Sequence, residues 1–284
     1  MTRRLFQPNW AKVIPYVIMH LAALISVLLV PFRWSLVELC VGLYFFRMFW
    51  LSAGNHRYFS HRAFNTSRIF QFVIGLMGNL SLMRGPISWA SHHRYHHYHS
   101  DAPKDFHSPL QHGFLWSHTL WFLSRDYEET RLAEVRDLNR YPELVWLNKY
   151  YFLPAYVSAA LLWIYGGFPA FAWGFLLSTV LTWHCAFLFN SMAHSFGKRA
   201  YGTQDTSRNS LFLAFLILGE GWHNNHHHHM NAARVGWEWW QVDPTYYVLW
   251  LMSKTGLIWD LKGAPPREIL EKSRVRDALP AVVK

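Results

Sequence analysis

The sequence predicts an all-α integral membrane protein, and three observations point to this fold class. Hydrophobic residues make up 52% of the 284 residues and charged residues only 15%, whereas soluble domains carry roughly 25% charged residues. Four apolar runs each approach the ~20 residues that a helix needs to cross the hydrocarbon layer. The mean hydropathy is nevertheless only +0.01, so the chain cannot consist of spans alone. We therefore expect four transmembrane helices in two hairpins, together with a polar part rich in His and Arg.

The first two spans are expected at residues 13–31 and 35–53. The first run ends at Pro31, and the second begins after a very short connection that contains Arg33. A signal peptide is the alternative for the first run, because basic residues precede it. The second run follows at once and no clear small-x-small cleavage site is present, which favours a helical hairpin.

The second hairpin is expected at residues 150–165 and 168–189, with the Gly-Gly pair 166–167 as its turn. Two shorter apolar runs, 69–83 and 211–218, fall below the length of a span. We expect both to form helices at the membrane interface or beneath the spans, with a re-entrant segment as the alternative.

Lys and Arg set the predicted orientation. They are concentrated in residues 54–149 and 194–284, while the two hairpin connections contain only Arg33. By the positive-inside rule, both long segments and both termini face the cytoplasm. The whole chain, 1–284, is then a single multi-pass domain.

The net charge of +10 could indicate nucleic-acid binding. The basic residues, however, flank apolar runs and form no basic arm with stacking aromatics, so we expect membrane lipid as the partner and no nucleic acid. The two cysteines, Cys40 and Cys185, lie inside apolar runs and are expected to be buried and unpaired.

Histidine is the unusual residue of this chain, with 18 copies. The candidate metal ligands fall into three dense clusters and one isolated position. They are His56 and His61; His93, His96 and His97; His194; and His223, His226 and His227.

The spacing of these histidines suits metal binding. In a helix, residues four apart share one face and a residue three apart flanks it, so an H-x-x-H-H run can direct three imidazoles to one side. His56 and His61 are five apart, which places them roughly 140° around an ideal α-helix. This pair converges only if the helix ends or distorts there. Asn190 and His194 again share a face.

Nine imidazoles are too many for one ion, because a tetrahedral zinc needs four ligands at most. Nine suit two ions with open positions for water or oxygen. Imidazole accepts Fe, Zn, Cu or Ni, so the ligand type leaves the metal open. Surface histidine is the alternative for any one cluster, and we expect hydrogen-bonding or structural roles for the other nine histidines. These are His20, His92, His99, His107, His112, His118, His184, His228 and His229.

The motifs resemble those of the membrane-bound fatty acid desaturases, in particular the bacterial acyl-CoA or acyl-lipid delta-9 type. The resemblance covers about residues 52–261. It rests on the segments 55–61 (NHRYFSH), 89–97 (WASHHRYHH), 101–109 (DAPKDFHSP), 190–194 (NSMAH), 205–209 (DTSRN) and 219–227 (GEGWHNNHH). In one respect the chain departs from the pattern, because His228 and His229 follow the last motif where relatives often have other residues.

The resemblance implies four membrane helices beneath a cytosolic helical cap that holds two iron ions. It assigns as ligands the nine clustered histidines, and it assigns Asn190 a metal-bound water. It also implies O2 as co-substrate, location in a bacterial inner membrane, and a fatty acyl substrate linked to CoA, a carrier protein or a glycerolipid. The sequence contains no His-Pro-Gly-Gly motif, so we expect electrons from a separate carrier such as ferredoxin, rubredoxin or cytochrome b5.

Several neighbours of these motifs have candidate supporting roles. Glu220 and Asp101 can orient imidazole N–H groups, with helix capping or a surface position as the alternative. Trp89 and the aromatic residues of the first two spans are candidate walls of an acyl tunnel, with an interfacial aromatic belt as the alternative.

Three arginines, Arg57, Arg94 and Arg208, can meet a phosphate-bearing headgroup or an acidic electron carrier. The alternative is that they pair with Asp105 or Asp205.

Two other functions are weighed against desaturation. A lipid hydroxylase uses the same histidine motifs, and only its products distinguish it. A histidine-rich metal transporter normally places polar ligands within its spans, whereas only His20 and His184 lie well inside the runs here.

Overall fold

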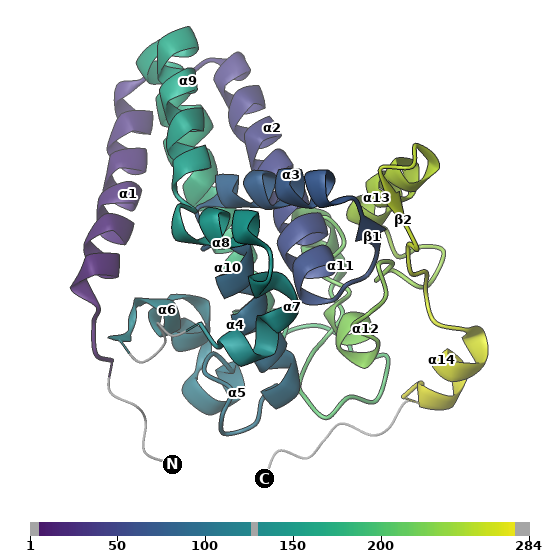
Figure 1. Ribbon diagram of the computed structural model, residues 1–284. Coiled ribbons are helices and arrows are strands. Elements are labelled where there is room, and N and C mark those ends of the chain that lie inside the picture. Colours follow the sequence, from purple (N-terminus) through teal and green to yellow (C-terminus); the bar gives the residue numbers. More distant parts are fainter. Residues whose placement is uncertain (1–5, 126–129, 276–284) are drawn as a thin grey trace.

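The computed structural model describes residues 6–125 and 130–275. The chain is mostly helical, and its longest helices stand together at one end of the molecule (Figure 1). Among the described residues, three helical stretches are long and apolar enough to cross a membrane: Trp10–Leu29, Trp34–Ser60 and Leu153–Ser191.

The first stretch is helix α1 (Trp10–Leu29), which begins where the Asn9 side chain accepts a hydrogen bond from the Ala11 N–H. The second is α2 (Trp34–Trp50), and it continues directly into η1 (Leu51–Ser60), which is a π-helix. The second helix therefore extends past the predicted end at residue 53, because the wider turns of η1 carry it on into the first histidine motif.

The third stretch comprises α9 (Leu153–Ala170), the π-helical η6 (Phe171–Leu177) and α10 (Ser178–Ser191). Its backbone reverses at Gly167, whose φ of 64° is a conformation that favours glycine. Leu162 consequently lies close to Gly174, which could not happen in a straight helix. The predicted turn at 166–167 is thus present, and α9 packs against η6 as the two arms of a hairpin.

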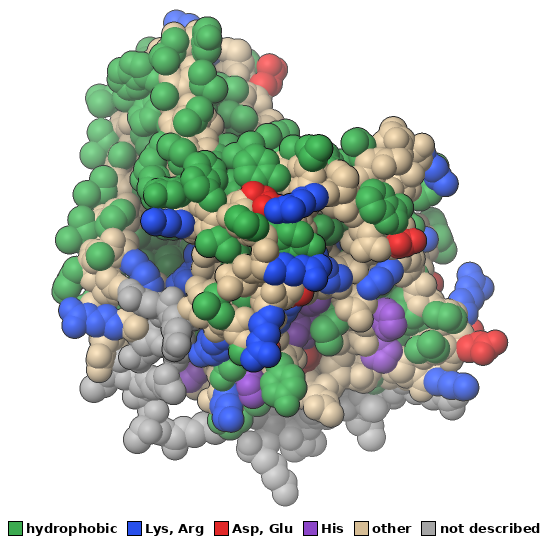
Figure 2. Space-filling view, in the orientation of Figure 1, with side chains coloured by type: hydrophobic (Ala, Val, Ile, Leu, Met, Phe, Trp, Pro, Cys, Tyr) green, Lys and Arg blue, Asp and Glu red, His purple; other side chains and the backbone are tan. Residues whose placement is uncertain are grey.

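The arms of both hairpins pack on one another and leave apolar side chains on the outside. Helices α1, α2 and α9 all contact η6, and α10 contacts α1 and α2. Outward-facing residues such as Leu28 (76% exposed) and Ile164 (70%) are apolar, and hydrophobic side chains cover this end of the molecule (Figure 2). Large exposed apolar surfaces of this kind mark contact with a membrane or a partner.

Shorter elements form the other half of the molecule. Between the hairpins the chain forms β1 (Asn65–Thr66), α3 (Arg68–Gly78), η2 (Asn79–Ser81), α4 (Pro86–His99), α5 (Pro109–His112), η3 (Trp116–Leu120), α6 (Trp121–Leu123), η5 (Leu132–Val135), α7 (Arg136–Asn139) and α8 (Pro142–Lys149). After the second hairpin it forms α11 (Leu211–Leu216), α12 (His223–His228), α13 (Pro244–Lys254), β2 (Ile258–Trp259) and α14 (Arg267–Ser273). Lys and Arg side chains gather over this half (Figure 2).

The two ends of this half are tied together by the antiparallel pair β1–β2, in which Asn65 lies opposite Trp259. The two short apolar runs form helices, namely α3 with η2 and α11. Their place at a membrane interface stays a prediction. Both cysteines are free, as expected. The terminal residues whose side of the membrane was predicted, 1–5 and 276–284, lie outside the described residues.

Candidate metal centre

All nine clustered histidines come together in two neighbouring groups of buried or half-buried rings. The members of each group have ligand nitrogens within 4.8 Å of one another. Group A consists of His56, His61, His93, His97 and His226, and group B of His96, His194, His223 and His227.

Local helix type explains how the first motif contributes to group A. Segment η1 is a π-helix, in which residues five apart are hydrogen-bonded and lie about one turn from each other. The His61 N–H accordingly donates to the His56 carbonyl at 3.3 Å, and the two rings lie 5.0 Å apart between centroids. The distortion that this spacing needed is therefore present.

Helices α4 and α12 each serve both groups. His93 and His97 of α4 belong to group A and His96 to group B, whereas α12 places His226 in group A and its other two histidines in group B. Each H-x-x-H-H run is thus divided between the groups, which differs from the expectation of three imidazoles directed to one side. Consecutive helical residues are about 100° apart, so the adjacent histidines of a run lean to opposite sides of the helix.

The nitrogen positions fit a metal ion in each group. In group A, the Nε2 atoms of His56 and His226, of His61 and His93, and of His93 and His97 lie 3.0, 2.9 and 3.0 Å apart. Two nitrogens at ~2.1 Å from one ion and roughly at right angles lie about 3.0 Å apart. In group B, His223 Nε2 lies 3.0 Å from His194 Nε2. His227 Nε2 is buried and has no hydrogen-bond partner among the described residues, which suits a metal ligand.

Carboxylates hold the outer nitrogens of four of these rings. The Nδ1 atoms of His56, His96, His194 and His227 lie 2.9, 3.0, 3.2 and 2.6 Å from oxygens of Glu220, Asp105, Asp101 and Asp205. A carboxylate on Nδ1 favours the tautomer whose Nε2 lone pair is free to bind a metal ion. The roles suggested for Glu220 and Asp101 agree with these contacts. The suggestion that Asp105 or Asp205 pairs with arginine is wrong, because these carboxylates contact the imidazoles of His96 and His227 instead.

The arginines have other partners. Arg57 is fully buried and lies 2.9 Å from both Glu220 and Asp243. Arg94 pairs with Asp137 at 2.7 Å, and Arg208 donates to the Gly197 carbonyl. Sequence reasoning missed Asp243, since it is 186 positions from Arg57 and no local spacing links them.

Burial keeps most of the imidazoles neutral. It lowers the pKa of His93, His97 and His226 well below the ordinary histidine value, and the neighbouring rings lower it further. Burial acts to raise the pKa of Asp205, but the hydrogen bond and charge of His227, together with the hydrogen bond from Ser207 and the charge of His194, outweigh it and hold that pKa well below its usual range. Neutral rings beside ionised carboxylates are the form that binds a cation.

Replacing Asp205 with asparagine is expected to weaken metal binding about 10- to 100-fold, the usual cost of losing an outer partner of a ligand. Asp205 touches His227 and its own loop, where Ser207 donates to it, so the fold should persist. Titration of the apoprotein with iron measures the change. Asp137→Asn, on the partly exposed pair with Arg94, is the control and should leave the affinity within about twofold. Equal affinities in the two variants would contradict the role of Asp205.

A cavity of about 830 Å³ opens onto both groups. Near the groups its wall includes His56, His93, His96, His223 and Asn190, so Asn190 lies beside the imidazoles although it belongs to neither group. Elsewhere its lining is largely aromatic and aliphatic.

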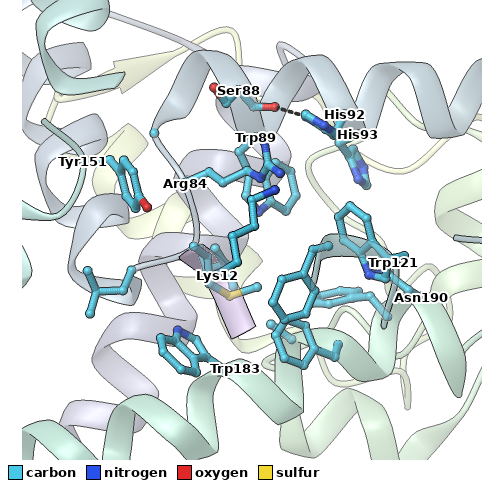
Figure 3. Close-up of a pocket in the computed structure, with 18 of the residues that line it drawn as sticks. Lys12, Arg84, Ser88, Trp89, His92, His93, Trp121, Tyr151, Trp183 and Asn190 are labelled. Carbon is cyan, nitrogen blue, oxygen red and sulfur yellow. Dashed lines mark hydrogen bonds between the residues drawn. The ribbon is translucent and has the colours of Figure 1, made fainter. Parts of the chain in front are cut away.

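Trp89 lines this cavity and stacks on His93, with ring centroids 4.8 Å apart. Tyr16 lines it from α1. The prediction of aromatic walls from the second span is wrong, because Leu51 and His56 are what that helix contributes. The other aromatic walls come from later segments and include Trp121 and Trp183 (Figure 3).

Two cations, Lys12 and Arg84, also line the cavity (Figure 3). No Asp or Glu is among the described residues of the lining. The cavity therefore combines an apolar interior, a pair of cations and the two histidine groups.

The other nine histidines lie outside groups A and B, but His107 belongs with His96 and Asp105 to a third set of side chains whose ligand atoms lie within 4.8 Å of one another. His92 Nδ1 contacts the Ser88 carbonyl. His20, His184 and His118 form a chain in which neighbouring rings are joined at 2.9 and 3.1 Å.

Fold and site together define a class: a helical protein with membrane-length apolar helices and two adjoining imidazole groups at the wall of an apolar cavity. The family model of the fatty acid desaturases matches residues 31–260. The chain is 37% identical over 268 residues to the sn-2 palmitoyl-lipid 9-desaturase of Nostoc sp. (strain 36), covering 92% of this chain and 93% of that protein.

Two further relatives give the same result. The sn-1 stearoyl-lipid 9-desaturase of Anabaena variabilis is 35% identical over 267 residues, covering 92% of this chain and 97% of the relative. The acyl-CoA C20 Delta5-desaturase of Anemone leveillei is 37% identical over 235 residues, covering 81% and 75%. The chain belongs to the fatty acid desaturase family, and it is an oxidoreductase that desaturates fatty acyl chains.

Proposed function

We propose that this enzyme inserts a double bond at position 9 of an acyl chain carried by a glycerolipid or by CoA, at a centre of two iron ions. The supporting observation is the cavity of about 830 Å³, whose apolar lining leads to both histidine groups. The two relatives matched over nearly their whole length are named as lipid 9-desaturases, which favours this position.

Groups A and B are the proposed iron sites, with five and four imidazoles. Iron bound there, together with O2, supplies the oxidant that removes two hydrogens from unactivated methylene groups, which no side chain can do. Asn190 is the proposed holder of a metal-bound water, because it lies in the cavity wall together with His223. The family is generally iron-dependent.

The protein's own side chains orient the imidazole rings and enclose the acyl chain. Asp101, Asp105, Asp205 and Glu220 fix ring tautomers through the Nδ1 contacts. The wall residues Trp89 and Phe189 hold the acyl chain beside the imidazoles and exclude water.

The reaction also requires electrons. Converting CH2–CH2 and O2 into CH=CH and two waters consumes two electrons and two protons. A separate one-electron carrier is the proposed donor, either ferredoxin, rubredoxin or cytochrome b5.

For the membrane we propose four spans in a bacterial inner membrane, formed by α1, by α2, by α9, and by η6 with α10, with the histidines of η1 on the cytoplasmic side. Both termini are then cytoplasmic, and the chain is one domain. The support is the reversal at Gly167, which divides the third apolar stretch into two arms, together with the distribution of Lys and Arg.

Expression in a host that lacks desaturases tests the function. Gas chromatography with mass spectrometry should find acyl chains with one double bond at position 9. Hydroxylated chains would instead identify a hydroxylase. Iron-free protein that moves zinc across vesicles would favour a transporter.

Narrowing the cavity is expected to change the preferred chain length. Met19 lines the cavity from α1, so Met19→Trp should shift the ratio of hexadecanoyl to octadecanoyl products by at least about tenfold, since one excluded methylene changes discrimination by that much or more. The neighbouring Ile18 is 59% exposed on the outside of α1. Ile18→Trp is therefore the control, and an equal shift in both variants would count against the cavity as the acyl site.

A further inference from the structure

We infer that a basic surface beside α12 is the docking site for a small acidic electron-carrier protein. This surface, called the basic loop surface, consists of Lys198, Arg199, Arg208 and His228, and the buried Tyr201 (3% exposed) stacks on His228. The inference rests on the proposed function, because it assigns a partner to the reaction's need for electrons.

The charge of the loop between α10 and α11 faces outward and is positive. Lys198 and Arg199 are exposed and Arg208 is half-buried. Within the part of the chain that the structure describes, the side chains of Arg199 and Arg208 donate to oxygens of their own loop, on Thr203 and Gly197. The loop's one acid, Asp205, is turned inward to His227 and Ser207. The loop therefore offers cations to a partner while its carboxylate is used at the metal centre.

The loop is held firmly in place. The N–H groups of Ala200 and Tyr201 both donate to the Asn224 side chain at 2.8 Å. Asn224 is completely buried in α12, between two proposed ligand positions. A surface fixed in this way needs no rearrangement to bind a rigid partner, which lowers the cost of association.

An aromatic contact connects this surface to the metal centre. The Tyr201 ring stacks on His228, with centroids 5.2 Å apart and planes at 15°. His228 is half-buried and is the residue next to His227 in α12. His227 in turn stacks on His97, with centroids 4.3 Å apart and planes at 28°. Since these last two belong to groups B and A, one path from Tyr201 and His228 reaches both proposed iron sites.

The surface lies away from the apolar end of the molecule. Helices α12 and α14 are at the end opposite the tips of α1 and α9 (Figure 1), and His, Lys and Arg side chains show on the face over α12 (Figure 2). A water-soluble partner can approach from that direction. In each encounter the carrier is oxidised by one electron and the metal centre is reduced by one electron, so two encounters supply one turnover.

The test is the rate at which a reduced acidic [2Fe–2S] ferredoxin reduces the iron-loaded enzyme, followed by stopped flow in discs of uncharged, zwitterionic lipid. Lys198→Glu/Arg199→Glu is expected to lower the second-order rate constant at low salt at least about tenfold, because electrostatic steering contributes 10- to 1,000-fold. The difference should shrink as salt is added.

Lys149→Glu/Lys254→Glu is the matched control, since it changes the net charge equally through two exposed cations on α8 and α13. Its rate constant should stay within about twofold of the unmodified enzyme. The inference would be overturned if both double variants kept the rate constant of the unmodified enzyme, or if both lost it to the same extent. An effect that appears only in discs of anionic lipid would show that this surface meets the membrane instead, and would also overturn it.

Chemical reduction separates this inference from the proposed function. Enzyme reduced by dithionite and then given O2 and substrate needs no carrier. Lys198→Glu/Arg199→Glu should form as much alkene as the unmodified enzyme in that single turnover, which also shows that it is folded. No alkene from the unmodified enzyme would remove the proposed function, whereas alkene together with an unimpaired ferredoxin rate would remove only the docking site.

Discussion

Replacing His227 with alanine is expected to lower desaturation more than about a hundredfold, beyond the 10- to 100-fold cost of losing an outer partner. The substitution leaves group B with three imidazoles and separates Asp205 from the centre. It also removes the ring that stacks on His97 of group A. Both sites should therefore lose affinity for iron. Iron content per chain and the acyl profile of the host are the two measurements.

His229→Ala is the control for this variant, because His229 is exposed and belongs to neither group. It should retain iron and activity, which would also settle the register of the four consecutive histidines. Full unsaturation in a host producing His227→Ala, with iron retained, would contradict the assignment of group B.

Replacing Glu220 with glutamine is expected to cost about 3 kcal/mol of stability, because breaking a buried ion pair leaves a buried charge without its partner. The Glu220 carboxylate is fully buried and contacts Ser52, His56 and Arg57. The charge of Arg57 would then rest on Asp243 alone. Iron affinity should fall as well, by about 10- to 100-fold, since His56 loses its outer partner.

The matched control for Glu220 is Glu143→Gln. Glu143 pairs with Arg68, whose side chain is 64% exposed, and exposed pairs contribute less than about 1 kcal/mol. Thermal unfolding in detergent compares the two variants, and iron titration follows the second effect. A Glu220→Gln protein as stable as the control would contradict the expected contribution of the buried Glu220–Arg57 ion pair to stability.

The positions of the helices could be predicted because apolar runs and the Gly-Gly pair are local signals. The ends of the second helix could not, since nothing in its composition marks the change from α- to π-helix at Leu51. The need for a distortion was nevertheless visible in the five-residue spacing of His56 and His61. The spacing thus indicated that the helix must be distorted, but it did not indicate that the distortion is a π-helix.

The candidate ligands could also be predicted from the sequence, because two of the three histidine clusters have the same H-x-x-H-H spacing. Their division into groups A and B could not, since each H-x-x-H-H run contributes to both. The charged partners that are distant in the sequence were the hardest to predict. Glu220 lies 163 positions from Arg57, and Asp205 lies 22 positions from His227, so only the folded chain shows which charge meets which ring.

The wide helical turns of η1 have a consequence for how this chain can vary. A one-residue deletion between His56 and His61 would leave a four-residue interval that suits an ordinary α-helix, yet it would also shift every following residue by about 100° relative to the bundle. The five-residue spacing of His56 and His61 and the π-helical form of η1 therefore depend on each other. A change in the spacing requires a change in helix type. A variant with a shortened motif would also need a compensating change in the following residues, so that the His61 ring again lies beside the other rings of group A.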